Sequence, residues 1–289
     1  MIKTPNVAGA FYPSSKEAII QMMEGFFSDV KSSPLRRRGV GGEEKLKAIA
    51  APHAWYIYSW PVAAYSYQAL KDNRKTIPKT FIIMAPSHYE YFEGVSVWLF
   101  DKFETPLGTI DTDMTLGKKL INEYPDYFSF VPAAFDQEHS YEVQLPFLQY
   151  VAGSKEQGAK NPVTWNLQPV TIKVLPLVFW NVNPIEVGNI LFELSKKEEM
   201  FFIVSSDLSH FMEYSNAVKT DEETLSDFVE KDINKIVHEA DACGIHPRLA
   251  LTQIAIKAKR TPELLEYKNS GDTAGDKSRV VGYGSMIYY

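Results

Sequence analysis

Cysteine is nearly absent from this chain. A single cysteine among 289 residues rules out a disulfide within the chain and any metal cluster held by its cysteines alone. Basic residues are not in excess either, because 30 Lys and Arg face 36 Asp and Glu for a formal net charge of −6. This mildly acidic balance argues against broad nucleic-acid binding.

Long apolar runs are missing too. No stretch approaches the ~20 apolar residues that span a bilayer. The N-terminus has no apolar core of signal-peptide length, and Pro5 and Pro13 interrupt it. We therefore expect a cytoplasmic protein that does not bind membranes.

Several common catalytic signatures do not occur. The glycine-rich run 39–42 precedes a predicted strand instead of following one, unlike a nucleotide-binding fingerprint. The sequence contains neither a G-x-S-x-G elbow nor an H-E-x-x-H pair. These absences weaken the interpretations as a nucleotide-binding protein, a serine hydrolase or a zinc protease.

The composition is that of an ordinary globular protein, 45% hydrophobic and 23% charged, and strand-like segments alternate with helix-like ones. The predicted strands are 46–51, 80–85, 95–100, 171–178, 200–205 and 280–289. The predicted helices are 15–30 (with Ser14 and Glu17 as a capping box), 61–71, 114–124, 142–151, 184–196, 221–237 and 247–259. This alternation predicts one α/β domain over residues 1–289, with a mainly parallel or mixed central sheet and helices on both faces. Segment 31–45, rich in Arg and Gly, is expected to be a flexible basic loop.

Three predicted strands run directly into loops that carry polar side chains. His53 follows the first of these strands, and His88 follows the second. Asp207 and His210 follow the strand at 200–205. Because ligands bind beyond the carboxyl ends of the strands in open α/β sheets, we expect these side chains to share one edge.

Two predicted helix starts add to this set. His139 lies in segment 138–142, where Ser140 is expected to cap the helix and Glu142 to lie near the imidazole. Cys243 precedes another helix start, where a thiol can have a lowered pKa and bind metal.

Each of these side chains taken alone is more often structural. A single imidazole usually has its hydrogen bonds satisfied within the fold, and a lone cysteine is usually a small buried hydrophobe. Five of the six histidines nevertheless fall at such junctions, and only His238 lies inside a predicted helix. The clustering indicates a functional pocket.

The motifs around these residues resemble those of the Memo family. The matching segments are VAGAFYP (7–13), PHA (52–54), APSH (85–88), EHSYEVQLP (138–146), SSDLSH (205–210), CG (243–244), YKNSGD (267–272), GDKS (275–278) and VVGY (280–283). They follow the family order from residue 7 to the C-terminus. Together they are highly specific, although the short fragments alone are weak.

The resemblance implies a fold like that of class III extradiol dioxygenases, the LigB-like group, with a metal-capable pocket at one sheet edge. Carried over to this sequence, the family's metal ligands are His53, His88 and Cys243, and His139, Asp207 and His210 line the same site. The resemblance also implies a radical-SAM protein and an AMMECR-type protein as partners. An animal member is known as a signalling adaptor and as a metal-dependent redox protein.

The chemistry of the implied ligand set is coherent. Two neutral imidazoles and a thiolate suit Fe(II), Cu or Zn, whereas Mg and Ca prefer oxygen ligands. We expect Fe(II) or Cu more than Zn, and a metal that purification can remove. Three protein ligands leave open positions for water, dioxygen or substrate. His210 or His139 then serves as general base, and Asp207 fixes a tautomer or accepts a hydrogen bond.

Two departures from the family pattern concern tryptophan. Trp55 and Trp60 stand where family members usually have glycine. Glycine allows a neighbouring group to approach the backbone closely and also allows a positive φ, whereas a tryptophan side chain prevents the close approach. We therefore expect a narrowed or reshaped pocket near His53.

Three functions remain open from the sequence. The first is a metal-dependent oxidoreductase. Dioxygenase activity does not follow from the implied fold, because the dioxygenases have a carboxylate ligand where this chain has Cys243. The second is a non-enzymatic binding protein that holds a peptide or a partner protein in the same cleft, helped by aromatic side chains. The third is metal-assisted hydrolysis, with His139 and Glu142 activating water.

Overall fold

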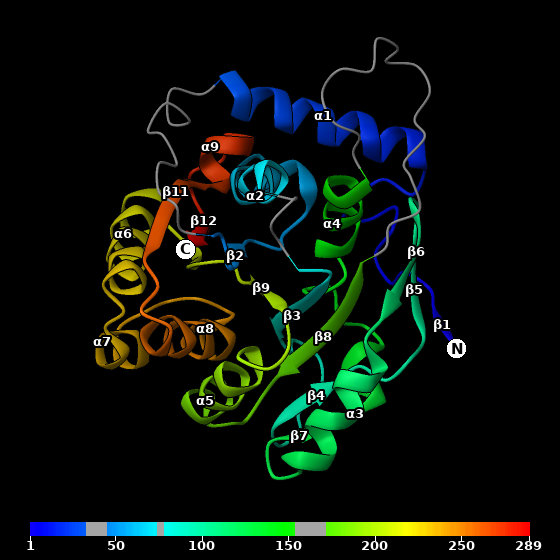
Figure 1. Cartoon of the computed structure of the whole chain (residues 1–289). Helices are drawn as coiled ribbons and strands as arrows, with labels where there is room; N and C mark the ends of the chain where they lie inside the picture. Colours follow the sequence, from blue (N-terminus) through cyan, green and yellow to red (C-terminus); the bar gives the residue numbers. More distant parts are fainter. Residues whose placement is uncertain (33–44, 74–77, 154–171) are drawn as a thin grey trace.

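In the computed structural model, residues 1–32, 45–73, 78–153 and 172–289 are described. Their strands form a mixed, mostly parallel sheet of twelve strands with helices packed on both sides (Figure 1). This confirms the α/β class with a mixed central sheet. The basic segment expected at 31–45 lies almost wholly outside the described residues, as does the start of the strand expected at 171–178.

The helices and strands alternate along much of the chain. The α-helices of the described residues are α1 (Lys16–Ser32), α2 (Tyr56–Asp72), α3 (Met114–Glu123), α4 (Gln144–Gly153), α5 (Pro184–Ser195), α6 (Tyr214–Glu230), α7 (Ile233–His238), α8 (Ile245–Lys257) and α9 (Ser270–Ala274). The strands are β1 (Ile2–Lys3), β2 (Ala48–Ala51), β3 (Thr80–Pro86), β4 (Val95–Val97), β5 (Lys102–Thr105), β6 (Gly108–Thr112), β7 (Phe128–Ser129), β8 (Lys173–Phe179), β9 (Met200–Ser205), β10 (His210–Met212), β11 (Pro262–Asn269) and β12 (Val280–Tyr288). A short 3-10 helix covers Pro132–Phe135.

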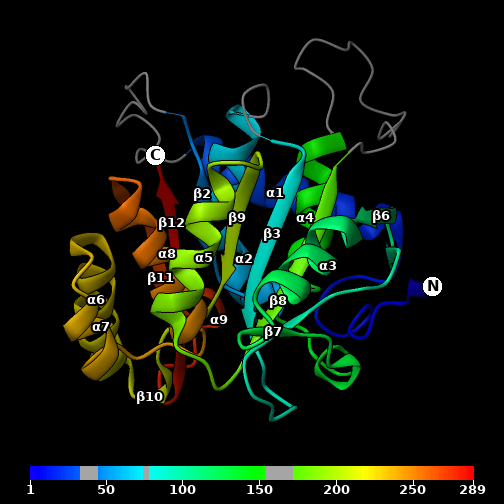
Figure 2. The same ribbon diagram turned by 60° about the horizontal axis from the view of Figure 1, so that its bottom comes forward.

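The middle of the sheet is parallel. The strand order is β1-β5-β6-β8-β3-β9-β2-β12-β10, and β6, β8, β3, β9 and β2 pair in parallel. Strand β12 runs antiparallel to β2 and also pairs with β11 and β10. Figure 2 shows β2, β9, β3 and β8 running side by side in one direction. Their carboxyl ends therefore meet at one edge, as expected for ligand-binding α/β sheets.

Alternate residues of the central strands face opposite helix layers. In β3, Phe81 and Ile83 pack into the core with α1, α2 and α4, whereas Ile82 and Met84 pack into the core with α3, α5 and α8. Successive side chains of a strand point to opposite faces of the sheet. Because both faces of these strands are buried, every side chain lies in one of the two cores, and both cores are apolar. The rigid sheet between the two cores fixes the strand ends that carry the site.

Several predicted boundaries were wrong for local reasons. Ser15, not Ser14, caps α1, because its hydroxyl accepts the Ala18 N–H. The helix expected at 221–237 is two helices, α6 and α7, because Lys231 adopts a left-handed φ of 60°. Helix α2 begins five residues before Pro61, which was expected to start it.

Among the described residues, no helix is both long and apolar enough to cross a membrane.

Candidate metal centre

The site lies where parallel strands end. His53 follows β2 by two residues, His88 follows β3 by two, and Asp207 follows β9 by two. His139 comes from the turn before α4, and Cys243 from the loop before α8. Five segments distant in sequence thus bring these side chains to one edge of the sheet.

Three of the histidines form a compact group. One ligand nitrogen from each of His53, His88 and His139 lies within 4.8 Å of the others. Their ring centroids are 5.1 Å (His53–His88), 5.5 Å (His53–His139) and 4.9 Å (His88–His139) apart. His53 is buried, whereas the His88 side chain is 27% exposed, so the group opens to solvent on the His88 side. This group can hold a metal ion.

The hydrogen bonds of His53 assign its tautomer. The Ser205 hydroxyl donates to the Ser140 carbonyl at 2.6 Å, so its oxygen accepts from Gln144 Nε2 (2.8 Å) and from His53 Nδ1 (3.0 Å). His53 therefore carries its proton on Nδ1 and presents the lone pair of Nε2 to the site. Burial, followed by the charge of His88, lowers the pKa of His53 well below its ordinary value, which keeps this ring neutral.

Glu138 orients the second histidine. Its Oε1 accepts from His88 Nδ1 at 2.9 Å and from Ser140 N at 2.9 Å, and its Oε2 accepts the His88 backbone N–H at 2.6 Å. Burial alone raises the pKa of Glu138, but the hydrogen bond and charge of His88 and the charge of His139 outweigh it and bring the pKa to about 2. The pKa of His88 is raised because Glu138 outweighs the opposing effect of burial. A carboxylate that holds one ring nitrogen of a histidine leaves the other for a metal.

His139 has an unpartnered nitrogen inside the site. Its Nδ1 is buried and has no hydrogen-bond partner among the described residues; Glu138 Oε1 is 3.7 Å away. Burial, followed by the charge of His53, lowers the pKa of His139 to about 3, so the ring is neutral and one of its two nitrogens has a lone pair for a metal. An orphaned buried nitrogen is costly unless something binds it. A transition-metal ion would satisfy it, so the residues present fit such an ion.

Cys243 lies beside the histidine group. Its Sγ is 3.3 Å from His53 Nε2, and it accepts the Asp207 backbone N–H at 3.3 Å. The expectation of a lowered thiol pKa was wrong, because burial and then the charge of Asp207 raise the pKa of Cys243 above its ordinary value. Without a metal the thiol stays protonated, and its two acceptors are His53 Nε2 and the Asp207 carbonyl, 3.7 Å from Sγ.

Asp207 and His210 take different places. Asp207 is buried, and its Oδ1 accepts the His53 backbone N–H at 2.7 Å, so it positions the loop after β2. Burial raises its pKa. His210 begins β10, pairs with Val281 of β12 and lies outside the three-histidine group. Its neighbour Phe211 has φ 61°, a conformation that costs about 1–3 kcal/mol for a bulky residue and is often found at functional sites.

The expected pairing of His139 with Glu142 was wrong. The Glu142 carboxylate accepts from the backbone N–H groups of Asn6 (2.7 Å) and Val7 (3.0 Å) and from the Tyr12 hydroxyl (2.7 Å). It therefore anchors the N-terminal segment and is not available to activate water. Ser140 is not a helix cap either, because its hydroxyl donates to the Pro86 carbonyl.

The two tryptophans at family glycine positions lie away from the pocket described below. Trp60 is fully buried in α2 and stacks on Phe147 of α4 with centroids 3.8 Å apart. Trp55 is 45% exposed and has φ −53°, so this backbone needs no glycine. Its ring centroid is 5.6 Å from that of Phe11, and the Phe11 ring centroid lies 4.6 Å from that of His139.

The groups that orient the site were missed in the sequence. Glu138 stands next to His139 within a motif, but nothing local shows that it contacts His88, fifty residues earlier in the chain. Ser205 of β9 holds the His53 ring, and Gln144 of α4 donates to the Ser205 hydroxyl.

Replacing Glu138 by glutamine is expected to weaken metal binding by about 10- to 100-fold. The carboxylate accepts N–H donors on both oxygens, and an amide would turn a donor toward one of them. Titration calorimetry with Zn(II) measures the effect. Glu198→Gln, which removes only an exposed ion pair with Lys119, is the control and should bind as the wild type does. Equal affinity in the two variants would show that Glu138 does not orient the site.

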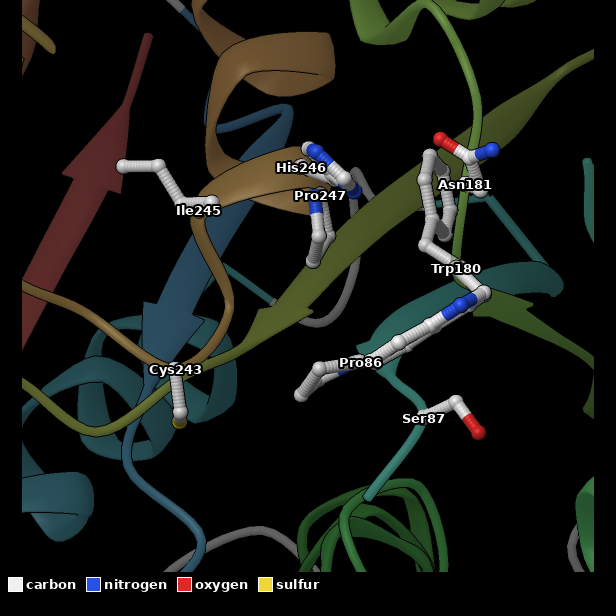
Figure 3. Close-up of a pocket in the computed structure, with 9 residues that line it drawn as sticks. Pro86, Ser87, Trp180, Asn181, Cys243, Ile245, His246 and Pro247 are labelled. Carbon is white, nitrogen blue, oxygen red and sulfur yellow. The ribbon is translucent and has the colours of Figure 1, made fainter. Parts of the chain in front are cut away.

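A cavity of about 300 Å³ adjoins the group (Figure 3). Its walls are Pro86, Ser87, Phe179, Trp180, Asn181, Cys243, Ile245, His246 and Pro247. Cys243 thus contacts both the cavity and His53. The cavity and the histidine group together have the form of a ligand pocket beside a metal centre.

The fold and the histidine group define a class: an α/β protein with a three-histidine, metal-capable centre at the carboxyl edge of its parallel strands. The family follows from comparison with known proteins. The family described as Memo-like protein matches residues 3–287, and this chain belongs to it.

Full-length relatives agree with the family assignment. A MEMO1 family protein of Nitrosopumilus maritimus is 31% identical, and the alignment covers 100% of both chains. A MEMO1 family protein of Sulfurisphaera tokodaii is 32% identical over 100% of this chain and 99% of its own.

Among solved structures, an uncharacterized protein from Escherichia coli K12 is 13% identical with a TM-score of 0.48, over 84% of this chain and 99% of that one.

Proposed function

We propose that this Memo-family protein binds a transition-metal ion at His53, His88 and His139 and performs metal-dependent redox or oxygenase-like chemistry on a small substrate. The observation that supports it is the convergence of one ring nitrogen from each of His53, His88 and His139 within 4.8 Å. The His139 ring also carries a buried Nδ1 that has no partner among the described residues. The proposal includes a relationship of the fold to the LigB-like extradiol dioxygenases.

The donor set favours a borderline or soft metal. Imidazoles suit Fe(II), Cu and Zn, and the neighbouring thiol strengthens the preference over Mg and Ca. Within that set we propose Fe(II) or Cu before Zn. Such an ion supplies Lewis-acid and redox chemistry and keeps positions open for substrate.

The chain's own residues supply positioning and proton transfer. Glu138 and Ser205 hold the rings of His88 and His53, and Asp207 holds the backbone of His53. We propose His210, which begins β10 a few residues after the end of β9, as the general acid or base.

Metal analysis of protein prepared without air tests the proposal. We expect close to one transition-metal ion per chain in the wild type and little in His88→Ala. His238→Ala removes an exposed histidine at the end of α7 and serves as the control, with full occupancy expected. Sub-stoichiometric iron, copper and zinc in the wild type after reloading, unchanged by His88→Ala, would refute the metal site.

Proton release gives a pH-dependent prediction. His88 has a raised pKa and is protonated below it, so a metal must displace that proton, whereas His53 and His139 have lowered pKa values and are already neutral. Metal affinity should therefore rise with pH until His88 is deprotonated and then level off. We expect the number of protons released on metal binding to fall as the pH rises through the raised pKa of His88. Zn(II) calorimetry in buffers of different ionisation enthalpy measures this; proton release that stays constant with rising pH would instead indicate a bound Cys243 thiolate.

A second candidate function is a non-enzymatic binding protein. Tyr89 and Tyr91 are 51% and 73% exposed, and the Tyr89 ring lies 6.1 Å from the His139 ring, so an exposed aromatic side chain stands beside the histidine group. Exposed aromatics are good binding anchors. We propose this surface for a peptide or for the radical-SAM and AMMECR-type partners that the resemblance implies. Pull-down of those two proteins that is equal for wild type, Cys243→Ala and His53→Ala would favour binding over metal chemistry.

A further inference from the structure

The cavity beside Cys243 has two facing walls. Ile245, His246 and Pro247 come from the start of α8, and Pro86, Trp180 and Asn181 come from the ends of β3 and β8 (Figure 3). In this view His246 and Asn181 face each other across the cavity, and Cys243 lies toward one end. The cavity is about 300 Å³, which is at the lower end of the range for small-molecule sites.

The lining is uncharged. Among the described residues that line the cavity, none is Lys, Arg, Asp or Glu. An ionised ligand in the cavity would lose part of its hydration without contacting a charged side chain of the lining, which is costly; the nearby Glu93 carboxylate is already paired with the Asn181 amide. The lining therefore selects neutral molecules.

The aromatic wall of the cavity and its polar groups further limit which ligands fit. Trp180 makes a T-shaped contact with Tyr91, with centroids 4.8 Å apart, and its indole offers the cavity an aromatic surface. The Asn181 Nδ2 donates to both oxygens of Glu93 at 2.9 Å, which leaves Oδ1 as an acceptor. The His246 imidazole supplies a second polar group at the opposite wall.

We propose that this cavity binds an uncharged, planar small molecule that carries a donor and an acceptor side by side, as a carboxamide does, and holds it next to Cys243. The ligand's ring packs against Trp180 and Pro247, and its polar group lies between Asn181 and His246. The proposal rests on the proposed function in one respect, that this molecule is the substrate of the metal centre. Binding of the molecule in the cavity does not need the metal.

Three isosteric probes test the charge selection. Benzamide is neutral, benzoate is an anion and benzamidine is a cation, and all three are planar and of similar size. We expect metal-free protein to bind benzamide at least about tenfold more tightly than either ion, as measured by ligand-observed NMR titration. Equal binding of the three probes would overturn the proposal.

Two tryptophan variants locate the binding. Trp180→Ala should weaken benzamide binding by about five- to tenfold, and Trp55→Ala, which removes an exposed tryptophan outside the cavity, should change it by less than about twofold. An unchanged affinity in Trp180→Ala would overturn the assignment of the cavity, and so would an equal loss in both variants. A thermal melt confirms that each variant is folded.

The two proposals fail separately. Loss of benzamide selectivity with stoichiometric metal binding intact would remove the cavity proposal alone. Absence of metal binding with selective benzamide binding in the metal-free protein would remove the metal centre and leave the cavity as a ligand site.

Discussion

His139→Ala is expected to lower metal affinity at least about a hundredfold, whereas Cys243→Ala should lower it less. The reason is geometric: His139 supplies one of three ring nitrogens within 4.8 Å, and its Nδ1 has no other partner among the described residues. Cys243 already has partners in the Asp207 N–H and His53 Nε2, and the thiol must lose a proton whose pKa is raised. Competition titration with Zn(II) measures both affinities.

Co(II) binding separates the two ligand sets. A thiolate bound to Co(II) gives an intense sulfur-to-metal charge-transfer absorption, and a site of three imidazoles does not. We expect the wild type and Cys243→Ala to give similar Co(II) spectra, and His238→Ala to match the wild type. A charge-transfer band that the wild type shows and Cys243→Ala lacks, together with full Co(II) binding by His139→Ala, would instead establish His53, His88 and Cys243 as the metal ligands.

Gly282→Ala is expected to lower the free energy of unfolding by about 3 kcal/mol or more, or to prevent folding. A Cβ at this position of β12 would lie 2.0 Å from Asp221 Oδ2 and 2.5 Å from its Cγ. Asp221 cannot easily move, because it is fully buried and accepts the Ser209 N–H at 2.9 Å and the Tyr267 hydroxyl at 2.8 Å. Displacing it breaks hydrogen bonds inside the protein, which adds the cost of unsatisfied buried groups.

The same substitution should disturb the metal centre from a distance. The Gly282 carbonyl accepts the Leu208 N–H, and its own N–H donates to the Ser209 carbonyl, each at 2.9 Å. These bonds hold the segment between Asp207 and His210. Urea denaturation measures the stability. Gly25→Ala in α1 is the matched control, because nothing lies within 4 Å of the added methyl, and alanine should stabilise the helix by up to about 1 kcal/mol. Stability of Gly282→Ala within about 1 kcal/mol of the wild type would contradict the prediction.

Much of the central sheet could be predicted because its signals are local. Segments such as 80–86 and 200–205 are continuous apolar runs that end at a polar loop, as strands buried on both faces do. The peripheral strands were missed because their patterns are weak. Strand β11 alternates between buried and exposed positions only loosely, and its pairing with β12 shifts register near Leu264. Such strands are defined by their partners more than by their own residues.

The site divides in the same way. The sequence by itself placed His53, His88 and Asp207 at the ends of neighbouring strands, because a strand and the loop that follows it are consecutive in the chain. Only the tertiary structure decided which groups meet: Glu138, not Glu142, lies beside the histidines, and His139 joins His53 and His88 while Cys243 stands next to them. Those outcomes depend on side-chain orientations in segments 36 to 190 residues apart, which no local pattern specifies.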